Sequence, residues 1–210
     1  MSSIALSGNA SGAGVFTIAS PNSASSFTAT LPAATTTLVG TDATQTLTNK
    51  TIQGGAITSG TAVASTSGTS IDFTGIPSWV KRITVMFTGV STSATSALII
   101  QLGTGATPTY TTSGYLGTTS TQTGTTDLFT TGYRLVNSNA AASVWHGNIV
   151  IANVTSNTWA ESAVLGNSNA GGVRTSGGSI PLAAALTAVR ITTENGTDTF
   201  DAGSINILYE

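Results

Sequence analysis

Short alternating runs of apolar and polar residues, separated by turn-forming residues, constrain the fold of this 210-residue chain most strongly. From about residue 67 onward, breaks rich in Gly, Ser, Asn and Thr recur roughly every 8 to 15 residues. Alternation with a period of two places one set of side chains on one face of a strand. We therefore predict about nine short strands over residues 67–210, forming an antiparallel β-sandwich with a jelly-roll-like arrangement.

Three of the runs show the alternation most clearly. Ile83, Val85 and Phe87 fall on one face of the run from Trp79 to Thr88. Leu98, Ile100 and Leu102 alternate in a second run, and Ile205, Ile207 and Tyr209 share one face of the third. The other predicted strands lie around Ile71–Phe73, Leu98–Leu102, Tyr110–Leu116, Leu128–Val136, Val144–Val154, Trp159–Leu165, Leu186–Thr193 and Ser204–Tyr209. Between them we predict polar loops at 103–109, 118–126, 137–142 and 167–178.

The N-terminal region has a different texture. Residues 31–52 read LPAATTTLVGTDATQTLTNKTI and contain few bulky apolar side chains. Ordering a backbone costs roughly 1–2 kcal/mol per residue, so this segment cannot bury a core alone. We predict an extended trimeric β-shaft over residues 1 to about 66, in which Leu38, Leu47 and Ile52 meet their symmetry mates. The alternative is a low-complexity linker.

Residues 28–52, TATLPAATTTLVGTDATQTLTNKTI, resemble the shaft-side repeat of bacteriophage tail-fibre and virion surface fibre proteins. Two later segments look like a C-terminal module of the same proteins: IDFTGIPSWVKRITVMFTGVS at 71–91 and VRITTENGTDTFDAGSINILYE at 189–210. The resemblance implies a homotrimer with an attachment region at 1–66 and a β-sandwich head at 67–210. It also implies a place in the virion, with other virion proteins bound at the N-terminal end.

Composition narrows the function classes. Charged residues make up 7 % of the chain, and the six basic residues are scattered apart from Lys81–Arg82, so we expect no nucleic-acid partner. No apolar run approaches the roughly 20 residues that a membrane helix needs, so we expect no membrane insertion. The N-terminus lacks the pattern of a secretory signal, which suits synthesis in a host cytoplasm.

Residues that carry chemistry are sparse. His146 has no second His or Cys with which to bind a metal, and a pairing with one of the many serines stays open. Glu194, Asp198 and Asp201 cluster around a predicted hairpin turn, and a Ca²⁺ site there is the alternative to a plain turn. We expect no enzyme, no cofactor and no metal, and we treat a glycan-cleaving spike as the remaining enzymatic alternative.

Aromatic residues near predicted loops are the candidates for ligand binding, because sugar rings stack on exposed aromatic faces. They are Tyr110, Tyr115, Tyr133, Trp145 and Trp159. The alternative for each is core packing, since aromatic rings carry much apolar area. Trp79, two residues after Pro77, is expected to plug the junction between shaft and head.

The expectation that follows is a non-enzymatic virion structural protein. As a trimeric tail fibre or fibre tip it would attach the particle to a host surface, with a cell-surface glycan as the expected ligand. The alternative is a capsid head-fibre or decoration protein with a structural role.

Overall fold

The structure is a computed structural model that describes residues 12, 24–26, 57–137 and 139–210. Leu38, Leu47 and Ile52 lie outside these residues, so the trimeric shaft stays a prediction. The described residues form strands and no helix, so this part of the chain contains no helix that could cross a membrane. The strands are β1 Thr58–Ser59, β2 Val63–Ala64, β3 Ser70–Thr74, β4 Arg82–Thr92, β5 Leu98–Thr104, β6 Thr109–Tyr110, β7 Leu116–Thr121, β8 Thr126–Phe129, β9 Tyr133–Arg134, β10 Trp145–Thr155, β11 Thr158–Asn167, β12 Val173–Pro181, β13 Leu186–Thr193 and β14 Phe200–Tyr209.

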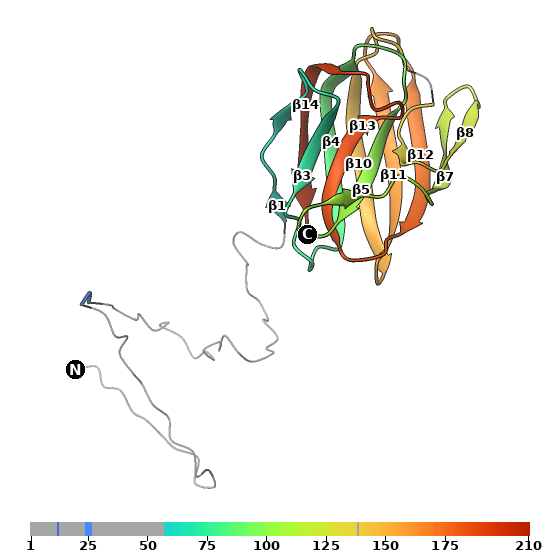
Figure 1. The fold of residues 1–210 in the computed structure, drawn as a ribbon. Coiled ribbons are helices and arrows are strands. Elements are labelled where there is room, and N and C mark those ends of the chain that lie inside the picture. Colours follow the sequence, from blue (N-terminus) through green and yellow to red (C-terminus); the bar gives the residue numbers. More distant parts are fainter. Residues whose placement is uncertain (1–11, 13–23, 27–56, 138) are drawn as a thin grey trace, which may run out of the picture. The chain divides into compact units, whose positions relative to one another are not determined.

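These strands form two antiparallel sheets. The nine-stranded sheet has the order β1-β14-β4-β10-β11-β12-β7-β8, and β2 also pairs with β14. The five-stranded sheet has the order β3-β13-β5-β6, and β9 also pairs with β5. Figure 1 shows the smaller sheet lying over β4, β10 and β11, while β7 and β8 extend beyond it on one side. The predicted all-β, antiparallel sandwich is confirmed.

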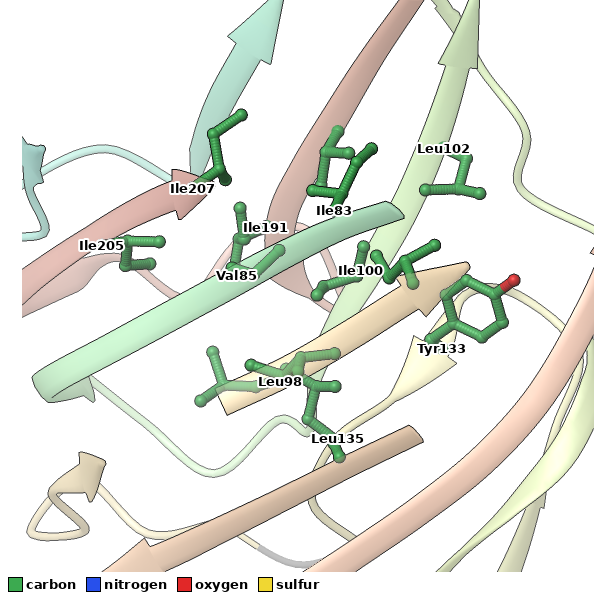
Figure 2. Close-up of a cluster of buried hydrophobic side chains, with 14 of the residues drawn as sticks. Ile83, Val85, Leu98, Ile100, Leu102, Tyr133, Leu135, Ile191, Ile205 and Ile207 are labelled. Atoms are coloured by element: carbon green, nitrogen blue, oxygen red, sulfur yellow. The ribbon is translucent and has the colours of Figure 1, made fainter. Parts of the chain in front are cut away.

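The core lies between the two sheets. Ile83 and Val85 of β4 point toward Ile100 of β5 and Ile191 of β13, as Figure 2 shows. All four side chains are fully buried, as the alternation of their runs predicts. Burying one such side chain stabilises the fold by about 1.5–3 kcal/mol, so this stripe fixes the register of the sheets.

Two strands occupy segments that the sequence marks as polar loops. β7 and β12 pair with each other across the predicted loops 118–126 and 167–178. The glycines explain why: a Cβ at Gly117 would lie 2.3 Å from Phe129, and one at Gly178 would lie 2.6 Å from the same ring. Phe129 therefore packs directly on the backbone of both strands, at positions where the sequence shows no apolar side chain.

Two predicted strands each divide between the sheets. The run Tyr110–Leu116 breaks at Gly114, whose φ is +84°, so β6 joins the smaller sheet and β7 the larger. The run Leu128–Val136 divides in the same way into β8 and β9. Alternation marks extended backbone but cannot show where a chain crosses from one layer to the other.

The sandwich begins earlier than the predicted boundary at residue 67. Thr58 pairs with Tyr209, and Val63 pairs with Ile205, so β1 and β2 both line the edge of β14. They satisfy backbone groups that an edge strand would otherwise leave unpaired. Residues 58–59 and 63–64 are thus part of the larger sheet.

Candidate functional site

Four of the five aromatic residues proposed for ligand binding lie in the core. Tyr115, Tyr133 and Trp145 have no exposed surface, and Trp159 is 4 % exposed. The prediction that they present ring faces on loops is therefore wrong. Each flanks a polar loop in sequence, but its side chain falls on the inner face of the sandwich.

Tyr110 is partly exposed, yet its ring is already occupied. The Arg190 guanidinium stacks 3.9 Å from the centre of the Tyr110 ring. Arg190 also holds Asp72 through two hydrogen bonds of 2.8 and 2.6 Å. Stacking and bidentate pairing use both the plane and the edge of the guanidinium. Tyr110 therefore belongs to a cross-strand cluster on the smaller sheet.

The acidic cluster near the C-terminus does not form a site. Glu194 pairs with Arg134, Asp201 accepts a hydrogen bond from Ser91, and Asp198 accepts one from the Ser96 backbone at 2.9 Å. The three carboxylates thus turn to different partners. Within the described ranges, no group of three or more His, Cys, Asp or Glu residues is placed to hold a metal.

His146 does pair with a serine, but with its proton on the wrong nitrogen for catalysis. Its Nδ1 accepts a hydrogen bond from the Gly89 backbone N–H at 3.2 Å. The neutral ring then carries its proton on Nε2, which lies 3.1 Å from the Ser168 hydroxyl and donates to it. A serine nucleophile needs an unprotonated Nε2 to take its proton, so this pair supplies no general base. His146 instead links β10 to Gly89 of β4 and to Ser168, the residue after β11.

Glu161 is a buried carboxylate that is not among the predicted site residues. It lies on the inner face of β11, in line with Trp159 and Ala163, and is 5 % exposed. Burial raises the pKa of Glu161 to about 7, although a 2.7 Å hydrogen bond from Ser176 lowers it and offsets part of the rise. Its Oε2 atom has no partner among the described residues. The alternation of TWAESAVL already places this residue inward.

One tryptophan is exposed. Trp79 is 54 % exposed, and its ring lies 6.0 Å from that of Tyr209 at a tilt of 49°. Its neighbours Ser78 and Val80 line a pocket of about 30 Å³, whose polar groups come from Lys81, Asn153 and Asn157. That volume has room for one water molecule or one hydroxyl group. Trp79 itself does not line this pocket, and its exposed ring is the feature of this region that is suited to stacking with a saccharide.

Residue Thr58 pairs with Tyr209, so Trp79 lies close to where the described chain enters the sandwich. Trp79 is predicted to fill a junction with the shaft. The segment that would form the other side of this junction lies outside the described residues, so that role stays a prediction.

No protein-family model, no curated protein and no solved structure matches this chain. The likeness of its motifs to phage fibre proteins therefore stays a prediction.

Proposed function

We propose that this chain is a non-enzymatic bacteriophage virion protein, a trimeric tail fibre or fibre tip that attaches the particle to a host-surface glycan. Residues before the sandwich form the shaft and bind other virion proteins. The sandwich is the head. Three weak sites on one axis hold a repetitive glycan far better than one site does, because binding at the second and third sites is intramolecular.

The exposed Trp79 face is the observation that carries this proposal. A pyranose ring packs its C–H groups on the indole, and its hydroxyls exchange hydrogen bonds with the polar lining of the adjacent pocket. The Trp79 ring is held in place because it contacts the Tyr209 ring, and Tyr209 packs against the core. This arrangement replaces the loop aromatics as the expected contact.

The test is a glycan array probed with the full-length protein and with two variants. Trp79→Ala removes the stacking face and should lower binding by about tenfold or more, if a sugar ring stacks with about the 1–3 kcal/mol that a nucleic-acid base gains on an aromatic ring. Trp79→Phe keeps an aromatic face and should retain much of the binding. Unchanged binding by Trp79→Ala would overturn this site, and near-ultraviolet circular dichroism would show whether the buried Trp145 and Trp159 keep their packing.

A capsid head-fibre or decoration protein is the second candidate, and the burial of four of the five candidate aromatics favours it. Immunogold labelling of intact particles separates the two roles. Label at the tail or fibre tips supports attachment, and label over the capsid supports decoration. Absence of label from every purified particle would overturn both.

A further inference from the structure

The Lys81 side chain carries a positive charge that pairs with no described carboxylate. The ion pairs that the described residues form use Arg82, Arg134 and Arg190. The Lys81 ammonium makes one long hydrogen bond, of 3.4 Å, to the Asn153 Oδ1 atom. An ammonium has three N–H donors, so most of the donor capacity of Lys81 is free for a ligand.

A second free donor lies in the wall of the pocket that Lys81 lines. Trp159 lines the same pocket of about 30 Å³ and is only 4 % exposed. Its Nε1 atom has no hydrogen-bond partner among the described residues. A buried N–H group without a partner costs free energy, so an oxygen atom that accepts a hydrogen bond from it gains affinity.

The pocket has no negative charge to set against these two donors. No Asp or Glu residue is among its lining residues. The Asn153 amide is already in use, because its Oδ1 accepts from Lys81 and its Nδ2 donates to the backbone carbonyls of Ser156 and Thr158. Two free donors, one of them cationic, fit a negatively charged oxygen, since charge-assisted hydrogen bonds are roughly twice as strong as neutral ones.

Both donors lie close to the exposed ring of Trp79. The chain neighbours of Trp79, Ser78 and Val80, line the pocket. The Cα atoms of Trp79 and Lys81 lie within about 7 Å of each other, because two residues span no more than this. The pocket has room for one group the size of a water molecule. One oxygen of a planar carboxylate fits this space, whereas a tetrahedral sulfate or phosphate group presents three oxygens.

We propose that this site binds an acidic saccharide. The sugar ring stacks on Trp79, its carboxylate pairs with the Lys81 ammonium, and one carboxylate oxygen accepts a hydrogen bond from the Trp159 Nε1–H group. The inference rests on the proposed attachment function and names the chemical class of its ligand. A neutral sugar can use the Trp79 face but leaves the Lys81 charge without a partner.

A glycan array tests the class when it carries each acidic glycan in two forms, as the free acid and as the methyl ester. The ester keeps the sugar ring and removes the charge. We expect the full-length protein to bind the free acid about fivefold more tightly, the upper range for an exposed ion pair. Lys81→Gln should remove this preference. The matched control is Arg82→Gln, which removes the same charge from a side chain that pairs with Glu210, and it should keep the preference.

The indole N–H signals in a nuclear magnetic resonance spectrum show which donors the ligand reaches. The chain has three tryptophans, so three such signals are expected. The acidic glycan that binds best on the array should shift the signals of Trp79 and Trp159. It should leave the Trp145 signal in place, because the Trp145 Nε1 atom already donates to Asn139 at 3.0 Å.

A preference for the free acid that requires Lys81 supports the inference. Equal binding of acid and ester, or binding to neutral glycans alone, would overturn the acidic class and leave attachment through Trp79 intact. A Trp159 signal that stays in place while that of Trp79 moves would overturn the pocket contact. Absence of binding to every glycan, or unchanged binding by Trp79→Ala, would overturn the proposed attachment site together with this inference.

Discussion

The Tyr133 hydroxyl donates a hydrogen bond of 2.9 Å to the backbone carbonyl of Trp159 and so ties the two sheets together. Tyr133 lies on β9 of the smaller sheet, and Trp159 lies on β11 of the larger one. A second buried bond joins the Leu102 backbone N–H to the Tyr115 hydroxyl at 2.7 Å. The two tyrosine rings meet edge to face, 4.9 Å apart. Residues that the sequence offered as sugar contacts thus connect the layers.

Removing the Tyr133 hydroxyl should weaken this connection. We expect Tyr133→Phe to lower the free energy of unfolding by about 1–2 kcal/mol, because a buried carbonyl loses its partner while the ring packing is kept. Urea unfolding followed by circular dichroism measures the change. An unfolding free energy equal to that of the unmodified protein would show that the bond contributes nothing. Tyr115→Phe should behave similarly, since its hydroxyl accepts the Leu102 N–H.

Glu161 should make stability depend on pH. Burial raises its pKa from 4.5 to about 7, so the folded protein binds more protons than the unfolded chain between these values. The free energy of unfolding therefore falls as pH rises from about 4.5 to about 7, and it stays lowered above that range. The full difference is on the order of 3 kcal/mol for a shift of this size.

Thermal unfolding at pH 5 and pH 8 measures this effect, with Glu161→Gln as the comparison. The amide does not ionise and keeps an acceptor for Ser176, so its contribution should not vary with pH. We expect Glu161→Gln to be more stable than the unmodified protein at pH 8. Equal pH dependence of the two proteins would contradict the assignment. In Ser176→Ala the pKa of Glu161 should rise further, because the hydrogen bond lowers it.

The hairpin between β10 and β11 contains a strained residue. Ser156 has a φ of +46°, and no other non-glycine residue in the described part of the chain has a positive φ. Glycine adopts this conformation without steric penalty and is favoured at the first position of such two-residue turns. We expect Ser156→Gly to raise the free energy of unfolding by about 0.5–1 kcal/mol. Asn157→Gly, at the neighbouring position, should lower stability; a gain there as well would contradict the strain argument.

Alternation predicts the parts of the fold that are amphipathic. Ile83, Val85 and Phe87 fall inward as expected, and so do Ile205 and Ile207. Alternation fails where burial comes from backbone contact, as at Gly117 and Gly178, because a glycine shows no preference for either face in the sequence. For the same reason, the sequence predicts polar loops at 118–126 and 167–178, where parts of β7 and β12 lie.

The candidate site was less predictable than the fold. Position beside a polar loop does not tell whether an aromatic ring points out or in, and Tyr115 and Trp145 both point in. Trp79 lies between Pro77 and Arg82, the first residue of β4. Its exposure therefore depends on the path of the backbone that leads into this strand, which the sequence does not show. The tautomer of His146 depends on Gly89, a residue 57 positions away, which no local pattern reveals.

Phe129 packs on the backbone of β7 and β12 so closely that adding one methyl group at Gly117 should destabilise the fold. A Cβ at Gly117 would meet Phe129 at 2.3 Å and the Gly177 carbonyl oxygen at 2.5 Å. The carbonyl belongs to the neighbouring strand and cannot move without breaking the β7–β12 pairing. Overpacking of this kind typically costs about 1–3 kcal/mol, so Gly117→Ala should lower the free energy of unfolding by at least that amount.

Gly166→Ala is the matched control for this change. Gly166 also lies within a strand of the larger sheet, on β11, but a Cβ there would meet no atom within 4 Å. Alanine costs less backbone entropy than glycine on folding, so Gly166→Ala should be neutral or slightly stabilising. Chemical denaturation of both variants, compared with the unmodified protein, measures the difference. Equal effects would mean that Phe129 moves aside freely, and the close packing of β7 and β12 beneath it would then not hold this side of the sheet together.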